Sequence, residues 1–289
     1  MKEDIRDKEY IKHEDIIKLN FIKNPSQYLF RRHYRQGLRS HVVEILKIDD
    51  VEKEKNGVID NKIRIFPRAE PVNILRIFKK KFYLKKSVLD EIKKLKILEK
   101  YISSKNLAKS QEFIVDYSIF HKGNFLLCGL QEFVKGEILD IWKISGPDRL
   151  LEIYDNMKQN PRYKIKVDTK LLVKRLQHNT KKFIDEIKKL ILIERYIPDL
   201  AGIGNLYLTI NGDIKLVDIN NVSKVSFDNT IFLDDKGYPV CDKSVEIISL
   251  LEKNILGKSI DMREKLYATF LCPSRTKDVK VLDDNFYFS

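Results

Sequence analysis

The sequence has little cysteine, with only Cys128, Cys241 and Cys272 among 289 residues. Their odd number and wide spacing give no disulfide framework and no zinc-binding pattern, which suits a reducing compartment. No run of about eighteen apolar residues is present, so no membrane-spanning helix is predicted. Residues 1–18 are charged throughout and lack the apolar stretch of a secretory signal. From these absences we expect a soluble, cytoplasmic protein.

Internal repeats and low-complexity tracts are also missing, as are a helix-turn-helix pattern and an RNP-type aromatic motif. Hydrophobic residues make up 43% of the chain and charged residues 34%, a mixture that folds. The length allows one large domain or two lobes with a substantial core.

Positive charge is in excess, with a formal net charge of +13. A basic surface attracts phosphate groups, whether of a nucleotide, a nucleic acid or an anionic lipid. The lysines are spread along the chain, so a solvated surface is the simpler interpretation. The densest basic cluster is interleaved with Phe82 and Tyr83 and consists of Lys79, Lys80, Lys81, Lys85 and Lys86. Such a cluster either binds nucleic acid or forms a strand-to-helix connection that faces water.

Extended segments dominate the first half of the chain. Residues 41–48 and 62–66 are predicted to form a hairpin with a long loop, because the turn-forming pair Asn56-Gly57 lies between them. Residues 72–78 predict another strand. Strands at 113–117 and 125–128 flank a turn at 122–124.

One helix is expected in that half. Ser87 is a candidate N-cap, with Asp90 and Glu91 in the first turn, where the helix dipole favours acids. Val88, Ile92, Leu95 and Ile102 then share one face at helical spacing.

The second half is predicted to be more helical. A long helix begins at Asp168 or Thr169 and ends near Ile193, and a final helix covers residues 244–254 with Gly257 beyond it. The inner face of the long helix is predicted to carry Leu172, Leu176, Phe183, Ile187 and Leu190. Between the helices, strands 206–210 and 214–217 are joined by Asn211-Gly212, the strongest hairpin signal in the chain.

The segment 198–221, PDLAGIGNLYLTINGDIKLVDINN, carries the most chemical information. A glycine-containing loop presents Asp199 and Asn205, and the hairpin then leads to Asp218 at the end of an apolar strand. Because a short hairpin brings its ends together, we expect Asn205 and Asp218 to lie side by side. An amide oxygen and a carboxylate converging there would suit magnesium, whose remaining ligands would be phosphates.

This segment resembles the catalytic and metal-binding loops of protein kinases and of their relatives, the aminoglycoside and lipopolysaccharide-sugar phosphotransferases. The resemblance implies that Asn205 and Asp218 bind Mg²⁺, with Ile219-Asn220 where protein kinases have Phe-Gly. Asp199 is the candidate for the catalytic aspartate.

Upstream features follow in the order that the resemblance implies. Residues 127–137 resemble the strand and hinge that bind adenine, with Gln131, Glu132 and Phe133 at the hinge. Glu91 corresponds to the helix glutamate that pairs with a basic residue of the preceding strand. That basic residue, expected to contact the phosphates of ATP, is either Arg76 or Lys79.

The sequence also departs from the kinase pattern. Asp199 and Asn205 are six residues apart rather than five, and Tyr196-Ile197-Pro198 replaces the histidine-centred lead. No glycine-rich loop is present. Gly37 is the only glycine near the first strands, and its neighbours Arg35, Arg39, Ser40 and His41 are alternative phosphate ligands.

The sequence therefore predicts an α+β, protein-kinase-like fold with two lobes, a small N-lobe sheet and a reduced, mainly helical C-lobe. We expect an N-terminal extension at 1–25, an N-lobe at 26–134 and a C-lobe at 135–289. The resemblance implies transfer of the ATP γ-phosphoryl group, with Mg²⁺, to a hydroxyl of an unidentified small molecule or protein. The alternatives are a pseudokinase that acts as a nucleotide-binding or regulatory module, and a basic protein that binds nucleic acid or anionic surfaces weakly.

Overall fold

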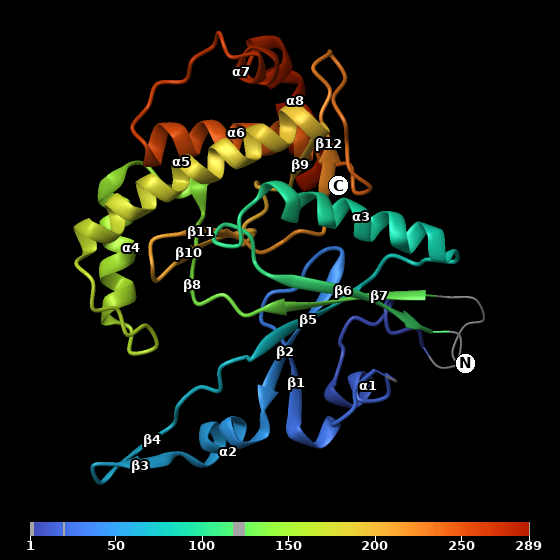
Figure 1. The fold of residues 1–289 in the computed structure, drawn as a ribbon, viewed down its shortest axis with the longest axis vertical. Helices are drawn as coiled ribbons and strands as arrows, with labels where there is room; N and C mark the ends of the chain where they lie inside the picture. Colours follow the sequence, from blue (N-terminus) through green and yellow to red (C-terminus); the bar gives the residue numbers. More distant parts are fainter. Residues whose placement is uncertain (1–2, 20, 118–124, 289) are drawn as a thin grey trace. The chain divides into compact units, whose positions relative to one another are not determined.

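The computed structural model describes residues 3–19, 21–117 and 125–288, and it is a mixed α+β structure (Figure 1). Its contacts group the chain into two compact units. The first contains residues 1–93 and 109–133, and the second contains residues 94–108 and 134–289. No helix within the described ranges is long and apolar enough to cross a membrane. The turn predicted at 122–124 lies outside the described residues.

An antiparallel five-stranded sheet forms the centre of the first unit, in the order β1-β2-β5-β7-β6. The strands are β1 (Tyr28–Arg32), β2 (Ser40–Lys47), β5 (Asn73–Phe78), β6 (Ser110–Asp116) and β7 (Phe125–Glu132). Residues at alternate positions, such as Leu75 and Ile77 or Leu126 and Cys128, pack into one apolar core. The strands predicted at 72–78, 113–117 and 125–128 are thus present, and β7 extends to Glu132.

The N-terminal segment packs against this sheet. It contains the short helix α1 (His13–Ile16) and the 3-10 turn η1 (Pro25–Gln27). Ile5, Ile11, Ile16 and Leu19 are buried in the same core as the sheet residues. These four residues of the segment 1–25, which is predicted as an N-terminal extension, are thus part of the core of the first unit.

The hairpin predicted between residues 41–48 and 62–66 is wrong. The intervening chain forms a helix, α2 (Ile48–Asn56), whose first turn carries Asp49 and Asp50, where the helix dipole favours acids. Gly57 ends it with a φ of +72°. A separate hairpin of β3 (Val58–Asp60) and β4 (Ile63–Ile65) follows, with positive φ at both turn residues, the geometry that matches strand twist.

The predicted helix of this half is α3 (Lys85–Tyr101). It begins two residues before Ser87, so Ser87 lies inside the helix and its first turn carries no acid. Val88, Leu95 and Ile102 are buried as predicted, together with Leu98. The end of α3 and the residues after it belong to the second unit, where Ala108 N donates to Leu216 O (2.9 Å).

Helices make up most of the second unit: α4 (Pro147–Gln159), α5 (Thr169–Glu194), α6 (Val240–Leu250), α7 (Lys265–Phe270) and α8 (Pro273–Phe288). Asp168 caps α5 by accepting a hydrogen bond from Leu171 N (3.2 Å). All five residues predicted for its inner face are fully buried. Helix α6 begins four residues before the predicted start and continues into a π-helical turn at Leu251–Ile255.

Two small sheets complete the second unit. One has the order β11-β10-β8, with β8 (Gly136–Ile138), β10 (Leu206–Thr209) and β11 (Ile214–Leu216), and a 3-10 turn, η2 (Ile141–Lys143), follows β8. The other pairs β9 (Tyr196–Pro198) with β12 (Val222–Lys224). The predicted Asn-Gly hairpin joins β10 and β11, and Gly212 has a φ of +85°.

Candidate active site

Asp199 follows β9 directly. Helix α5 ends at Arg195 in the left-handed conformation, with a φ of +57°, which turns the chain into β9. The pairing of β9 with β12 continues one step further, because Asp199 N donates to Asn221 O (2.8 Å). The backbone of Asp199 is therefore fixed by regular sheet structure.

The loop from Asp199 to Asn205 folds back on itself. The Asp199 carboxylate accepts hydrogen bonds from Ala201 N (3.0 Å) and Gly202 N (3.2 Å). Asn205 Nδ2 donates to Asp199 O (2.9 Å), and Asn205 N donates to Gly202 O (2.9 Å). These bonds bring Asn205 against Asp199, although the two residues are six positions apart.

Both glycines of this loop are needed, for different reasons. Gly204 has a φ of +92°, which residues with a side chain rarely adopt. Gly202 gives space, since a Cβ atom there would lie 2.6 Å from Asn205 Nδ2 and 2.9 Å from its Oδ1. The position of the Asn205 side chain thus depends on the absence of one at residue 202.

Asp218 reaches the same place through the hairpin. Leu206 is paired with Leu216, and Val217 N donates to Asn205 O (2.8 Å), so Asp218 follows directly beside Asn205. Its carboxylate accepts a hydrogen bond from Asn220 N (3.1 Å). The structure therefore brings together Asp199, Asn205 and Asp218, as the sequence predicts, and all three belong to the second unit.

Two carboxylates in one site affect each other. Burial raises the pKa of Asp199, and the negative charge of Asp218 raises it further. Hydrogen bonds from Gly202, Ala201 and Asn221 act in the opposite direction without cancelling the rise. Asp199 therefore holds its proton more tightly than an ordinary aspartate.

Two further residues of the site were missed in the sequence analysis. Asn221 Nδ2 lies 3.4 Å from Asp199 Oδ2 and 3.1 Å from Asp234 Oδ2, so one amide group bridges two carboxylates. Asp234 in turn accepts hydrogen bonds from Lys236 N (2.8 Å) and Tyr238 N (3.0 Å). The only sequence signal was the place of Asn221, three residues after Asp218. No signal pointed to Asp234.

The oxygen atoms of this site suit a hard cation. Because Asn205 Nδ2 is engaged by Asp199 O, the side chain presents Oδ1 to a ligand. That amide oxygen and the Asp218 carboxylate are the ligand types that Mg²⁺ prefers, with phosphates and water as the others. Across the described residues, no group of three or more His, Cys, Asp and Glu side chains is arranged to hold a metal ion.

The residues predicted to contact phosphates lie in the first unit. Arg76 is buried on β5, where its neighbours across the sheet are Val42 and Gly129. Lys79 follows β5, and its backbone N donates to Arg39 O (2.9 Å). Glu91 forms an ion pair with Lys80 (2.8 Å), the residue after Lys79, whereas the predicted partner was Arg76 or Lys79.

The predicted hinge lies where the chain leaves β7. Gln131 is buried, opposite Ile74 on one side and Ser110 on the other. Glu132 N donates to Lys109 O (2.9 Å), and Glu132 Oε1 accepts a hydrogen bond from Lys109 N (3.0 Å). The backbone N–H of Glu132 is therefore used by the sheet. Phe133 is the last residue of the first unit.

No family model and no curated protein matches this chain. Any inference about its function therefore starts from the geometry of Asp199, Asn205 and Asp218.

Proposed function

We propose that this chain is a phosphotransferase with a protein-kinase-like architecture, which uses ATP and Mg²⁺ to phosphorylate a hydroxyl group. The observation that carries the proposal is the convergence of Asp199, Asn205 and Asp218 at one place in the second unit. One carboxylate and one amide oxygen suit the metal, and a second carboxylate with a raised pKa suits a proton acceptor.

In the proposed reaction, the acceptor hydroxyl oxygen forms a bond to the γ-phosphorus while the bond from that phosphorus to the ADP oxygen breaks. Asp199 orients the hydroxyl group and accepts its proton. Asp218 and Asn205 Oδ1 would hold Mg²⁺, which neutralises charge on the phosphates. The phosphate-contacting role of Arg76 or Lys79 stays a prediction, as does the adenine-binding role of residues 131–133.

Calorimetric titration of ATP with and without Mg²⁺ tests the metal assignment. Asp218→Asn removes the anionic ligand but keeps the size of the side chain, so Mg²⁺-dependent affinity for ATP should fall by about 10–100-fold. Asp213→Asn, on the same hairpin but at its turn, is the matched control and should bind as the wild type does. An Asp218→Asn protein with unchanged Mg²⁺-dependent affinity would show that the metal site is elsewhere.

A pseudokinase is the second candidate, and a specific observation favours it. Both carboxylate oxygens of Asp199 already have hydrogen-bond donors, because Oδ1 accepts from Ala201 N and Gly202 N and Oδ2 lies 3.4 Å from Asn221 Nδ2. Asp199→Ala and wild type can be compared with radiolabelled ATP and a cell extract as the source of acceptors. Transfer by the wild type alone supports the enzyme, whereas ATP binding by both proteins without transfer supports the binding module.

A further inference from the structure

Two connections meet at one end of the sheet of the first unit. The turn between β1 and β2 covers residues 33–39, and the connection from β5 into α3 begins at Lys79. Because Ser40 at the start of β2 is paired with Phe78 at the end of β5, the two connections emerge side by side. Lys79 N donates to Arg39 O (2.9 Å) and joins them directly. We call residues 33–39 and 79–86 the tip surface.

The tip surface is strongly basic. It contains no aspartate or glutamate and seven cationic residues, namely Arg35, Arg39, Lys79, Lys80, Lys81, Lys85 and Lys86. Two acids outside it form ion pairs with it, Asp7 with Lys81 (2.6 Å) and Glu91 with Lys80 (2.8 Å).

The same surface exposes large apolar side chains. Tyr34 and Leu38 in the turn are 67% and 65% exposed, and Tyr83 and Leu84 in the connection are 68% and 67% exposed. Single exposed apolar residues are common on proteins. Four of them within two basic segments that are hydrogen-bonded to each other give a mixture of exposed apolar and cationic side chains, the composition expected of an interaction site.

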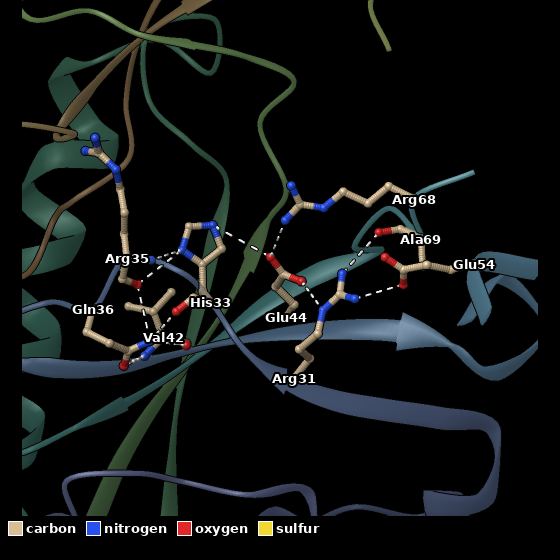
Figure 2. A network of polar contacts seen from close by, with 9 residues as sticks. All are labelled: Arg31, His33, Arg35, Gln36, Val42, Glu44, Glu54, Arg68 and Ala69. Carbon is tan, nitrogen blue, oxygen red and sulfur yellow. Dashed lines mark hydrogen bonds and ion pairs between the residues drawn. The ribbon is translucent and has the colours of Figure 1, made fainter. Parts of the chain in front are cut away.

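Both segments are held in place by buried or hydrogen-bonded neighbours. Gln36 closes the turn, because its Nε2 donates to His33 O (2.7 Å) and Val42 O (2.9 Å) while its Oε1 accepts from Val42 N (3.1 Å) (Figure 2). In the other segment, Phe82 is buried, and its O accepts a hydrogen bond from Phe125 N (3.0 Å). The backbone of both segments is therefore ordered before binding. Docking through Tyr34, Leu38, Tyr83 and Leu84 would not carry a large entropic cost of ordering these segments.

The strand that carries the turn is also fixed. Glu44 on β2 is buried and forms an ion pair with Arg31 on β1 (2.9 Å), with Arg68 (3.8 Å) and His33 (3.9 Å) on its other oxygen (Figure 2). Burial lowers the pKa of His33, so this histidine contributes little charge near neutral pH. The charge of the tip surface thus comes from lysine and arginine and does not change in the neutral range.

We propose that the tip surface docks on an anionic lipid bilayer. Lysine and arginine would bind the lipid headgroups, tyrosine suits the interface between water and lipid, and the two leucines would enter the acyl region. A nucleic acid would use the cations and the tyrosines but would leave Leu38 and Leu84 in water. This surface belongs to the first unit, and the proposal does not depend on phosphotransferase activity.

Vesicle sedimentation with the full chain tests the proposal. Binding should require phosphatidylserine in phosphatidylcholine vesicles and should weaken with added salt. The triple variant Lys81→Gln/Lys85→Gln/Lys86→Gln should bind about 100-fold less tightly, and Leu38→Ser/Leu84→Ser about tenfold less tightly. The matched controls are Lys170→Gln/Lys174→Gln/Lys181→Gln and Leu192→Ser/Ile193→Ser, which change exposed residues of α5 and should bind as the wild type does.

Three results would overturn the proposal. The first is equal binding to vesicles without phosphatidylserine, and the second is an equal loss of vesicle binding in the tip variants and the control variants. The third is that no protein binds vesicles, while the wild type binds single-stranded RNA and the tip variants do not. A second measurement uses a variant that should fold normally. Tyr83→Trp places a fluorophore at an exposed position of the tip surface. Brominated phosphatidylserine vesicles should quench it beyond the quenching of wild-type protein, and equal quenching would contradict docking through the tip surface.

Discussion

At the scale of single residues, the candidate site depends on Gly202, which has no side chain. Gly202→Ala would place a Cβ 2.6 Å from Asn205 Nδ2, so the amide must move away from Asp199. We expect Mg²⁺-dependent affinity for ATP to fall by about 10–100-fold, as for other losses of support around a metal ligand. Ile203→Ala, an exposed position of the same loop, is the control for calorimetry. Equal affinity in all three proteins would contradict the role of Asn205.

Asp199 gives a prediction about stability. Its folded-state pKa is raised, so its ionised form is less favourable in the native protein than in the unfolded chain. This cost develops as the pH rises through the unfolded-state pKa and is complete above the folded-state pKa. Asp199→Asn should therefore raise the urea midpoint near neutral pH, and the gain should vanish as the pH falls well below about 3.9, the ordinary pKa of aspartate, where Asp199 is protonated in both states.

Asp228 is a control of opposite sign. Hydrogen bonds from Thr230 lower its pKa, so its ionised form stabilises the fold, and this contribution is lost as the pH falls through the folded pKa. Asp228→Asn should lower the urea midpoint near neutral pH. If both substitutions shift the midpoint in the same direction, the electrostatic argument for Asp199 is wrong.

At the scale of elements, one buried ion pair ties α8 to α6. Arg275 Nε donates to Asp242 Oδ1 (2.5 Å), and the other guanidinium nitrogens donate to Asp228 O (2.7 Å) and Thr230 O (2.9 Å). Both side chains are almost fully buried. The pair therefore fixes the C-terminal helix and the loop that precedes α6.

Breaking this pair should destabilise the protein more than replacing it. Arg275→Met leaves the Asp242 carboxylate buried without its cation and should cost about 3–5 kcal/mol of unfolding free energy. Adding Asp242→Leu should recover much of that loss, because no buried charge remains. Urea denaturation measures both, with Lys277→Met on the same helix as the exposed control. A double variant no more stable than Arg275→Met would show that shape, rather than charge, decides.

At the scale of the whole molecule, the net charge of +13 predicts weak attraction to any polyanion. Binding of random-sequence DNA should be measurable at low salt and should fall steeply as salt rises, because the contacts release counterions. Fluorescence anisotropy over a salt series checks this. Sequence-specific binding that persists at physiological salt would instead favour the nucleic-acid-binding alternative over the phosphotransferase.

The elements with strong local signals could be predicted from the amino-acid sequence. Local chemistry is enough to predict features that depend only on neighbouring residues. These are the period of apolar residues in α5, its Asp168 cap and the Asn-Gly turn between β10 and β11. The adjacency of Asn205 and Asp218 followed from the same short hairpin. By contrast, α2 was predicted as part of a long loop, because its mostly polar residues give little apolar periodicity.

Contacts between residues that are distant in the chain could not be predicted and are known from the three-dimensional structure. Strand order and loop paths decide three kinds of contact: the pairing of β2 with β1 and β5, the ion pair between Lys80 and Glu91, and the bridge from Asp199 through Asn221 to Asp234. These contacts leave no periodic pattern in the sequence. The tip surface has the same origin: its two segments are forty residues apart in the chain, and the antiparallel register of Ser40 with Phe78 joins them.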